Sequence, residues 1–312
     1  MNASFEGSTC QPSASAHQSA RGCGSTVSMT TWKSYAMSPM LKVGFVGMSE
    51  QWQEVGDRAY VRRHRSYDMN VGLVVGDGHC LVLDTRTSYR EAADLIDAIR
   101  RITPAPWTVV NSHSHFDHCF GNALFRPAEI WGHVRCAEEL ELYGDQQRAG
   151  VIKGSPELRD ELEELTIVPP DQTFSTAAGL DIGGRMVHLR HFGLGHSSND
   201  VVVQVPDAGV VFAGDLVEEG APPAFSDSYP LDWPVTLGKM LEEMPEPVIV
   251  PGHGAVVDRA YALAQREELA LVAELAEKAH VEGLRDLIRR FPYPEDVTRQ
   301  AIDRAFMQLD AV

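Results

Sequence analysis

The chain has 312 residues, 44% of them hydrophobic, which can bury the core of one large domain or two modest ones. No stretch approaches the roughly 20 successive apolar residues of a membrane helix. The net charge of −17 disfavours a nucleic-acid partner, because such proteins carry basic patches that neutralise phosphates and the basic run Arg62–Arg65 is short. We therefore expect a small-molecule substrate, with no nucleic acid and no membrane as partner; the oligomeric state stays open.

The cysteines and the first 48 residues indicate the cellular setting and the start of the folded part. Five cysteines without a CxxC pair disfavour a disulfide scaffold, so a cytoplasmic location is expected. Residues 1–48 are rich in Ser, Gly, Ala and Thr and lack the basic start and apolar core of a secretory signal. We expect a disordered N-terminal extension or an over-extended reading frame there.

The ordered pattern begins near residue 50. Apolar runs separated by turn residues predict strands at Arg58–Arg65, Met69–Val75, His79–Asp84 and Trp107–Val110. Apolar residues at helical spacing predict helices at Tyr89–Arg101, Gly132–Gln147 and Glu157–Leu165. The strand Trp107–Val110 leads directly into a histidine-rich segment.

The second half of the chain repeats this order. Strands are expected at Arg185–His191, Asp200–Val205, Val210–Ala213 and Val248–Val250. Helices are expected at Val235–Met244 and Asp258–His280 and within the last thirty residues. Each half thus contains strands followed by helices and places His and Asp residues at strand ends. This predicts an α/β fold of four layers, αβ/βα, in which two mixed β-sheets are sandwiched by helices.

The densest chemical signal is the run His113-Ser114-His115-Phe116-Asp117-His118. Zinc and similar metals take imidazole nitrogens and carboxylate oxygens as ligands. Alternate residues of an extended segment point the same way, so His113 and His115 can reach one metal together. Asp117 and His118 stand at the turn into the next helix and can reach a second. Only 12 histidines occur in the chain, so three within six positions indicate metal binding.

Three more candidate ligands stand at the ends of later strands. They are His196 in Gly193–Asp200, Asp215 after the run Val210–Ala213, and His253 after Val248–Val250. Each has glycine or other small neighbours, which let the backbone approach a crowded site.

In this order of residues the chain resembles the metallo-β-lactamase superfamily, whose motif is HxHxDH followed by a His, an Asp and a His. The resemblance covers about residues 50–280 and implies the metallo-β-lactamase fold for residues 49–280, with 281–312 as a C-terminal helical extension. It also implies a first metal held by His113, His115 and His196. A second would be held by Asp117, His118 and His253, and Asp215 would bridge the two. A bridging aspartate is more similar to glyoxalase II and general hydrolases than to the lactamases.

The function implied is that of a metallo-hydrolase with two Zn²⁺ ions per chain, although the same ligands accept iron or manganese. Two such ions can share a water and lower its pKa, and the hydroxide so formed attacks a small carbonyl substrate: a thioester, lactone, ester or amide. Asp117 would orient this nucleophile and could accept its proton. The alternatives are an iron-dependent persulfide dioxygenase-like oxidoreductase, which uses the first site only, and a phosphodiesterase or nuclease.

Other side chains are candidates for supporting roles. Asp84 either holds a ligand ring from behind or caps a helix or turn, and Ser112, Ser114 and Asn199 are weaker candidates for such support. In the loop 218–233, the aromatic residues Phe225, Tyr229 and Trp233 either face the substrate or pack the loop onto the fold. Cys119 is expected to pack rather than bind metal, and His191 is expected to be structural although it lies close to His196 in sequence.

Overall fold

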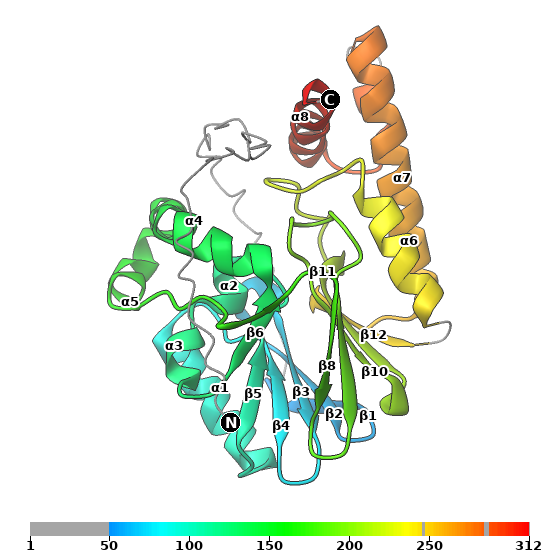
Figure 1. Cartoon of the computed structure of the whole chain (residues 1–312). Helices are drawn as coiled ribbons and strands as arrows, with labels where there is room; N and C mark the ends of the chain where they lie inside the picture. Colours follow the sequence, from blue (N-terminus) through cyan, green and yellow to red (C-terminus); the bar gives the residue numbers. More distant parts are fainter. Residues whose placement is uncertain (1–49, 245–246, 284–286, 312) are drawn as a thin grey trace, which may run out of the picture. The chain divides into compact units, whose positions relative to one another are not determined.

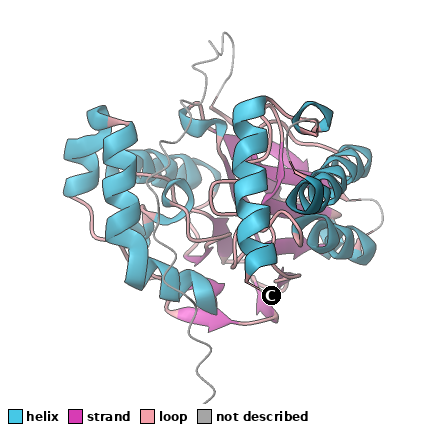
Figure 2. Ribbon diagram, turned by 90° about the horizontal axis from the view of Figure 1, so that it is seen from above, coloured by secondary structure: helices cyan, strands magenta, loops and turns pink. Residues whose placement is uncertain are grey.

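Two β-sheets packed face to face form the centre of the fold, which a computed structural model describes for residues 50–244, 247–283 and 287–311 (Figure 1). The side chains between the sheets come from both of them, including Leu81 and Val110 of the first and Leu189 and Phe212 of the second. Helices lie on both outer sides of the strands (Figure 2). This confirms the predicted α/β class and the four-layer αβ/βα order.

The first sheet has seven strands in sequential order, β1 to β7. Neighbours are antiparallel from β1 to β4 and parallel from β4 to β7, so the sheet is mixed. Its strands are β1 Trp52–Gly56, β2 Ala59–Arg63, β3 Asn70–Val75, β4 Cys80–Leu83, β5 Trp107–Val110, β6 Ile130–His133 and β7 Gln172–Phe174.

The second sheet has five strands in the order β12-β11-β10-β9-β8. Its neighbours are antiparallel except for β11 and β12, which run parallel and are connected through a helix. Its strands are β8 Ala177–Asp181, β9 Met186–Arg190, β10 Val202–Val205, β11 Val210–Glu218 and β12 Val248–His253. The predicted mixture of strand directions is therefore present in both sheets.

The helices divide between the two outer layers. Those of the first half are α1 Tyr89–Ile102, α2 Phe116–Cys119, α3 Asn122–Phe125, α4 Val134–Gly154 and α5 Arg159–Glu163. Those of the second half are α6 Trp233–Glu243, α7 Arg259–Glu282 and α8 Glu295–Asp310. Single 3₁₀ turns occur at η1 Ser66–Asp68, η2 Pro156–Leu158, η3 Pro206–Ala208 and η4 Ile288–Arg290.

Strand alternation explains why helices cover both outer faces. In β4, Leu81 and Leu83 point between the sheets, whereas Cys80 and Val82 point outward to the apolar face of α1. In β11, Val211 and Ala213 likewise point outward and pack in one cluster with α6, α7 and α8. Strands that are apolar on both faces are typical of sheets buried on both sides.

Some expected elements differ from the observed ones. Gly132 and His133, expected to be helical, end strand β6, and α4 begins only at Val134. Strands β1, β6, β7 and β8 were not predicted. The expected segment 1–48 lies outside the described residues, and the division of the chain at residues 48 and 280 stays a prediction. Among the residues that the structure describes, no helix is long and apolar enough to span a membrane.

Candidate metal centre

The histidine run leaves the first sheet where β5 ends. Residues 111–115 form a loop, and two of its backbone N–H groups donate hydrogen bonds to side chains from other segments of the chain. Ser112 N–H donates to Asp84 Oδ1 at 2.7 Å, and Ser114 N–H donates to Asn199 Oδ1 at 2.9 Å. His115 stands in extended conformation at the start of the short helix α2, which then carries Asp117 and His118. The loop is thus held in place before any ligand binds.

The three later candidates come from the second sheet. His196 lies in the loop between β9 and β10, and His253 is the last residue of β12. Asp215 does not follow a strand, as the apolar run suggested, but lies within β11, which continues to Glu218. The strand pairing shifts around Gly214, whose φ of +54° favours glycine. This break in the regular pairing lies next to Asp215, and such irregularities redirect side chains beside active sites.

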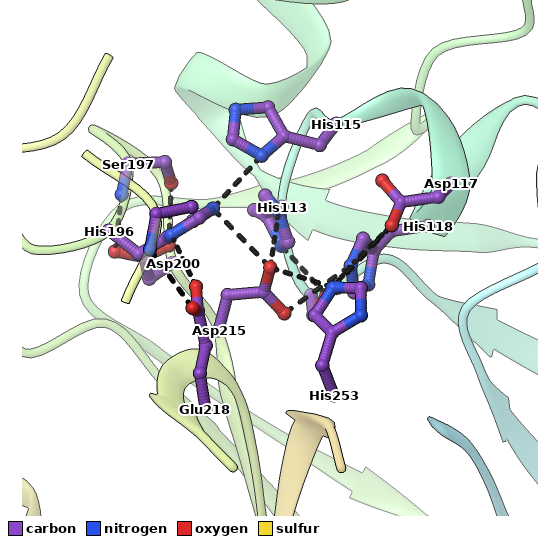
Figure 3. A network of polar contacts seen from close by, with 12 residues as sticks. His113, His115, Asp117, His118, His196, Ser197, Asp200, Asp215, Glu218 and His253 are labelled. Carbon is purple, nitrogen blue, oxygen red and sulfur yellow. Dashed lines mark hydrogen bonds and ion pairs between the residues drawn. The ribbon is translucent and has the colours of Figure 1, made fainter. Parts of the chain in front are cut away.

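All seven predicted residues gather into two groups (Figure 3). In each group the potential ligand atoms lie within 4.8 Å of one another. The first group contains His113, His115, His196 and Asp215, and the second contains Asp117, His118 and His253. In the first, His115 Nδ1 and His196 Nε2 are 2.9 Å apart. In the second, His118 Nε2 and His253 Nε2 are 3.4 Å apart, with Asp117 Oδ2 at 3.5 Å from His253 Nε2.

Asp215 lies between the two groups (Figure 3). Its Oδ2 is 3.4 Å from His196 Nε2 and 3.7 Å from His113 Nε2 on one side. On the other side, Oδ2 is 3.2 Å from His253 Nε2, and Oδ1 is 3.3 Å from His118 Nε2. This carboxylate therefore reaches imidazoles of both groups.

Each of the five imidazoles also has a polar atom close to the nitrogen that points away from the centre; four of these pairs are hydrogen bonds, whereas His196 Nδ1 and Glu218 Oε1 lie close together without hydrogen-bond geometry. The pairs are His113 Nδ1 with Ser112 Oγ at 3.0 Å, His115 Nε2 with Asp227 Oδ2 at 2.7 Å, His118 Nδ1 with Asp84 Oδ2 at 2.8 Å, His196 Nδ1 with Glu218 Oε1 at 3.1 Å, and His253 Nδ1 with the Tyr67 carbonyl at 2.7 Å. Such partners fix ring orientation and tautomer at metal sites.

These contacts fit a cation at the centre. The Tyr67 carbonyl can only accept, so when the ring of His253 is neutral its proton lies on Nδ1 and the lone pair of Nε2 points at His118. His113 Nε2 and Asp215 Oδ1 are buried without any hydrogen-bond partner. Buried lone pairs that face one another are unfavourable unless a positive charge lies among them. The residues present thus match the metal that the sequence suggested.

The pKa values of the site residues agree with this. Burial lowers the pKa of His196, but Asp215 and Glu218 outweigh burial and raise it to about 10. At His253 burial also lowers the pKa, yet Asp215 and Asp117 raise it to about 9. Burial opposes ionisation of Asp215, but the surrounding histidines, His253 foremost, hold its pKa well below the usual range. The centre therefore stabilises positive charge close to Asp215.

Two supporting carboxylates escaped prediction. Glu218, at the end of β11, contacts His196, and Asp227, in the loop between β11 and α6, contacts His115. The sequence indicated that this loop lies near the centre, but it drew attention to the aromatic residues. Phe225 and Trp233 are fully buried in the core around α6 and α7, so they pack the fold, whereas Tyr229 is half-buried.

The remaining candidates have structural roles of different kinds. Ser114 and Asn199 form a network with Glu139 of α4, in which Ser114 Oγ donates to Glu139 Oε2 at 2.7 Å. Cys119 is buried and directs its thiol to the His115 carbonyl, in agreement with the expected packing role. His191 belongs to neither group. Its ring packs against the ring of His133, with the two ring centroids 4.1 Å apart.

Substitution of Asp84 tests whether the outer partners, the polar groups behind the histidine rings, contribute to metal binding. We expect Asp84→Asn to weaken metal affinity at the second group by about 10–100-fold, because His118 Nδ1 loses its charged acceptor. Asparagine is the matched substitution, since Asp84 has a φ of +68° that asparagine also tolerates. Isothermal titration of metal-depleted protein measures the change. Unaltered affinity at both sites would show that the contact contributes only to folding.

Comparison with known proteins agrees with the fold and identifies the family. The family model of the metallo-beta-lactamase superfamily matches residues 68–253, more than half of the chain and all seven clustered residues. The chain belongs to the metallo-beta-lactamase superfamily. It is a metallo-hydrolase of that superfamily, as the sequence predicted.

Curated relatives are distant and differ in activity. The acyl-coenzyme A thioesterase MBLAC2 of Gallus gallus is 25% identical over 259 residues, which cover 76% of this chain and 87% of that protein. The metallo-beta-lactamase type 2 of Bacteroides fragilis is 27% identical over 116 residues, 36% of this chain and 47% of the relative. The probable metallo-hydrolase YqgX of Bacillus subtilis is 28% identical over 157 residues, covering 48% and 67%.

Solved structures share the fold. The metallo-beta-lactamase from Pontibacter korlensis has a TM-score of 0.53 at 18% identity, covering 70% of this chain and 98% of that one. The DIM-1 metallo-beta-lactamase has a TM-score of 0.56 at 17% identity, covering 70% and 96%. At such identities the likeness shows the four-layer architecture alone.

Proposed function

We propose that this chain hydrolyses a small carbonyl substrate, a thioester in the first instance, with two divalent metal ions. His113, His115 and His196 would hold one ion, Asp117, His118 and His253 the other, and Asp215 would serve both. The position of Asp215 carries this proposal, because its two oxygens lie within 3.2–3.7 Å of imidazole nitrogens from both groups. Zinc is the ion we expect, and the same donors accept iron or manganese.

Ions bound there would lower the pKa of a water molecule and stabilise negative charge on the carbonyl oxygen. The chain's own residues orient the reactants. Asp117 is 6% exposed and belongs to the second group, where its carboxylate can take up a proton from the attacking water. The outer partners Asp84 and Asp227 keep the rings of His118 and His115 from turning.

The substrate class rests on the relatives and on the ligand set. The Gallus gallus relative, which is named a thioesterase, aligns over 87% of its own length, whereas the lactamases of Bacteroides fragilis and Bacillus sp. align over 47% and 69% of theirs. A bridging aspartate in place of cysteine also favours general hydrolysis over lactam hydrolysis. In a thioester, water adds to the carbonyl carbon, the C–S bond breaks, and the thiol leaves with a proton.

Metal analysis with a hydrolysis panel tests the proposal. We expect protein purified without added metal to contain two zinc ions per chain and to hydrolyse thioesters faster than lactones, esters or amides. Removing the metal with a chelator should abolish turnover, and added Zn²⁺ should restore it. The measurements are elemental analysis by mass spectrometry and thiol release from acyl-thioester substrates.

Two outcomes would contradict the proposal. A single iron per chain together with oxygen consumption would instead indicate a persulfide dioxygenase-like oxidoreductase. Turnover of phosphodiesters without turnover of any carbonyl substrate would indicate a phosphodiesterase or nuclease.

A cytoplasmic location also stays a prediction. Within the described part of the chain, Cys80, Cys119 and Cys136 are free and buried.

A further inference from the structure

We propose that the C-terminal helix α8 positions the first group of metal ligands: Arg304 holds the loop that presents Asp227 to His115. This inference rests on the proposed metal centre but not on the substrate. The family model ends at residue 253, so α8 lies outside the matched region and nothing in that match assigns it a role.

The first step is the contact between loop and ligand. Asp227 Oδ2 lies 2.7 Å from His115 Nε2, and the other nitrogen of that ring points into the first group, 2.9 Å from His196 Nε2. A carboxylate only accepts, so it selects the tautomer with the proton on Nε2 and leaves Nδ1 free to bind metal. Asp227 therefore stabilises the orientation and tautomer of His115 in which Nδ1 faces the first group.

The second step is the contact between helix and loop. Arg304 donates from Nη2 to the Asp227 carbonyl at 2.8 Å and from Nε to the Ser228 carbonyl at 2.9 Å. One turn further along α8, Gln308 donates to Asp232 Oδ2 at 2.7 Å and accepts from the Leu231 N–H at 3.1 Å. Two side chains of one helix thus hold both ends of the segment 227–232, which has no regular secondary structure.

The third step is the anchoring of the helix itself. Ala301 and Ile302 of α8 are buried in the same core as Leu269 and Val272 of α7. Figure 1 draws α8 beside α7, above the ends of the strands. A packed helix is more rigid than an irregular loop. Hydrogen bonds from α8 therefore restrict the positions of loop residues such as Asp227 that support a metal ligand. Arg304 is accordingly a positioning residue, acting through Asp227.

Substitution of Arg304 by methionine tests the inference without a substrate. The matched control is Arg299→Met, on the same helix, where the arginine is exposed and pairs with Glu295. We expect Arg304→Met to weaken binding of one Co²⁺ equivalent by about tenfold or more and to leave the other unchanged. The visible absorption of bound Co²⁺, titrated into metal-depleted protein, reports both equivalents, and Arg299→Met should match the wild type.

A double-mutant cycle separates positioning from general stabilisation. Asp227→Asn should weaken the same Co²⁺ equivalent by a similar factor. If Arg304 acts through Asp227, the pair of substitutions should weaken binding no more than Asp227→Asn alone. If Arg304→Met does not fold, Arg304→Lys replaces it in the cycle, because lysine keeps the charge and can reach one carbonyl.

Each remaining outcome overturns the inference. Equal loss of both equivalents in Arg304→Met, or additive losses in the double variant, would show a general structural role for Arg304. Unchanged Co²⁺ binding in that variant would show that α8 does not influence the ligands. Failure of the wild type to bind Co²⁺ would refute the proposed metal centre and this inference with it, whereas Co²⁺ binding without thioester turnover would refute only the substrate class.

Discussion

Asp117→Ala is expected to lower kcat for the preferred substrate by about 10³-fold, because the variant lacks the carboxylate that we propose to orient and deprotonate the attacking water. Asp117 is suited to this role, since it is 6% exposed and its Oδ2 lies 3.5 Å from His253 Nε2 and 3.6 Å from His118 Nε2. Steady-state thiol release gives kcat, and metal content is measured on the same samples. Loss of one metal equivalent is expected as well, because the same carboxylate belongs to the second group.

Two further variants separate these effects. Asp117→Asn keeps the size and one oxygen of the side chain but removes its basicity, so we expect it to retain more metal than the alanine variant and still lose turnover. Asp97→Ala is the matched control, since Asp97 is an exposed aspartate on α1. An asparagine variant with a kcat close to that of the wild type would show that Asp117 is not the proton acceptor.

The strong signals in the sequence were local ones. The strand Trp107–Val110 could be predicted to the residue because an apolar run stands between a proline-rich turn and polar residues. The histidine run has a fixed relation to the end of that strand, so its clustering could be predicted too. Strand β8, Ala177–Asp181, escaped prediction because three of its five residues are Ala or Gly and only Leu180 is a large apolar residue, so the sequence shows no apolar alternation there.

The residues behind the histidine rings could be predicted from the sequence only in part. Asp84 could be suggested because it follows an apolar strand in the first sheet, next to the strand that carries the histidines. Asp227 could not, since its contact with His115 joins residues 112 positions apart and depends on a helix still further along the chain. The Tyr67 carbonyl that accepts from His253 has no signal at all, because every residue has a carbonyl.

A methyl group added at Gly252 is expected to disturb both groups of candidate metal ligands. A Cβ built at this position would lie 1.7 Å from Asp215 Oδ1 and 2.9 Å from the backbone carbon of Gly214. In Gly252→Ala the carboxylate must therefore move away from the position where it contacts His118, His196 and His253. Because displacements of about 1 Å at a reacting centre can cost about 10²-fold, we expect kcat to fall by at least that factor.

Metal content distinguishes this displacement from simple unfolding. Gly252→Ala should keep the far-ultraviolet circular dichroism of the wild type, since β11 and β12 remain paired by backbone bonds, while its zinc content falls below two per chain. Gly150→Ala is the control, because a Cβ there meets no atom within 4 Å in helix α4. Two zinc ions and full turnover in Gly252→Ala would contradict this prediction. They would show that the close contact between Gly252 of β12 and Asp215 does not position the Asp215 carboxylate between the two groups of ligands.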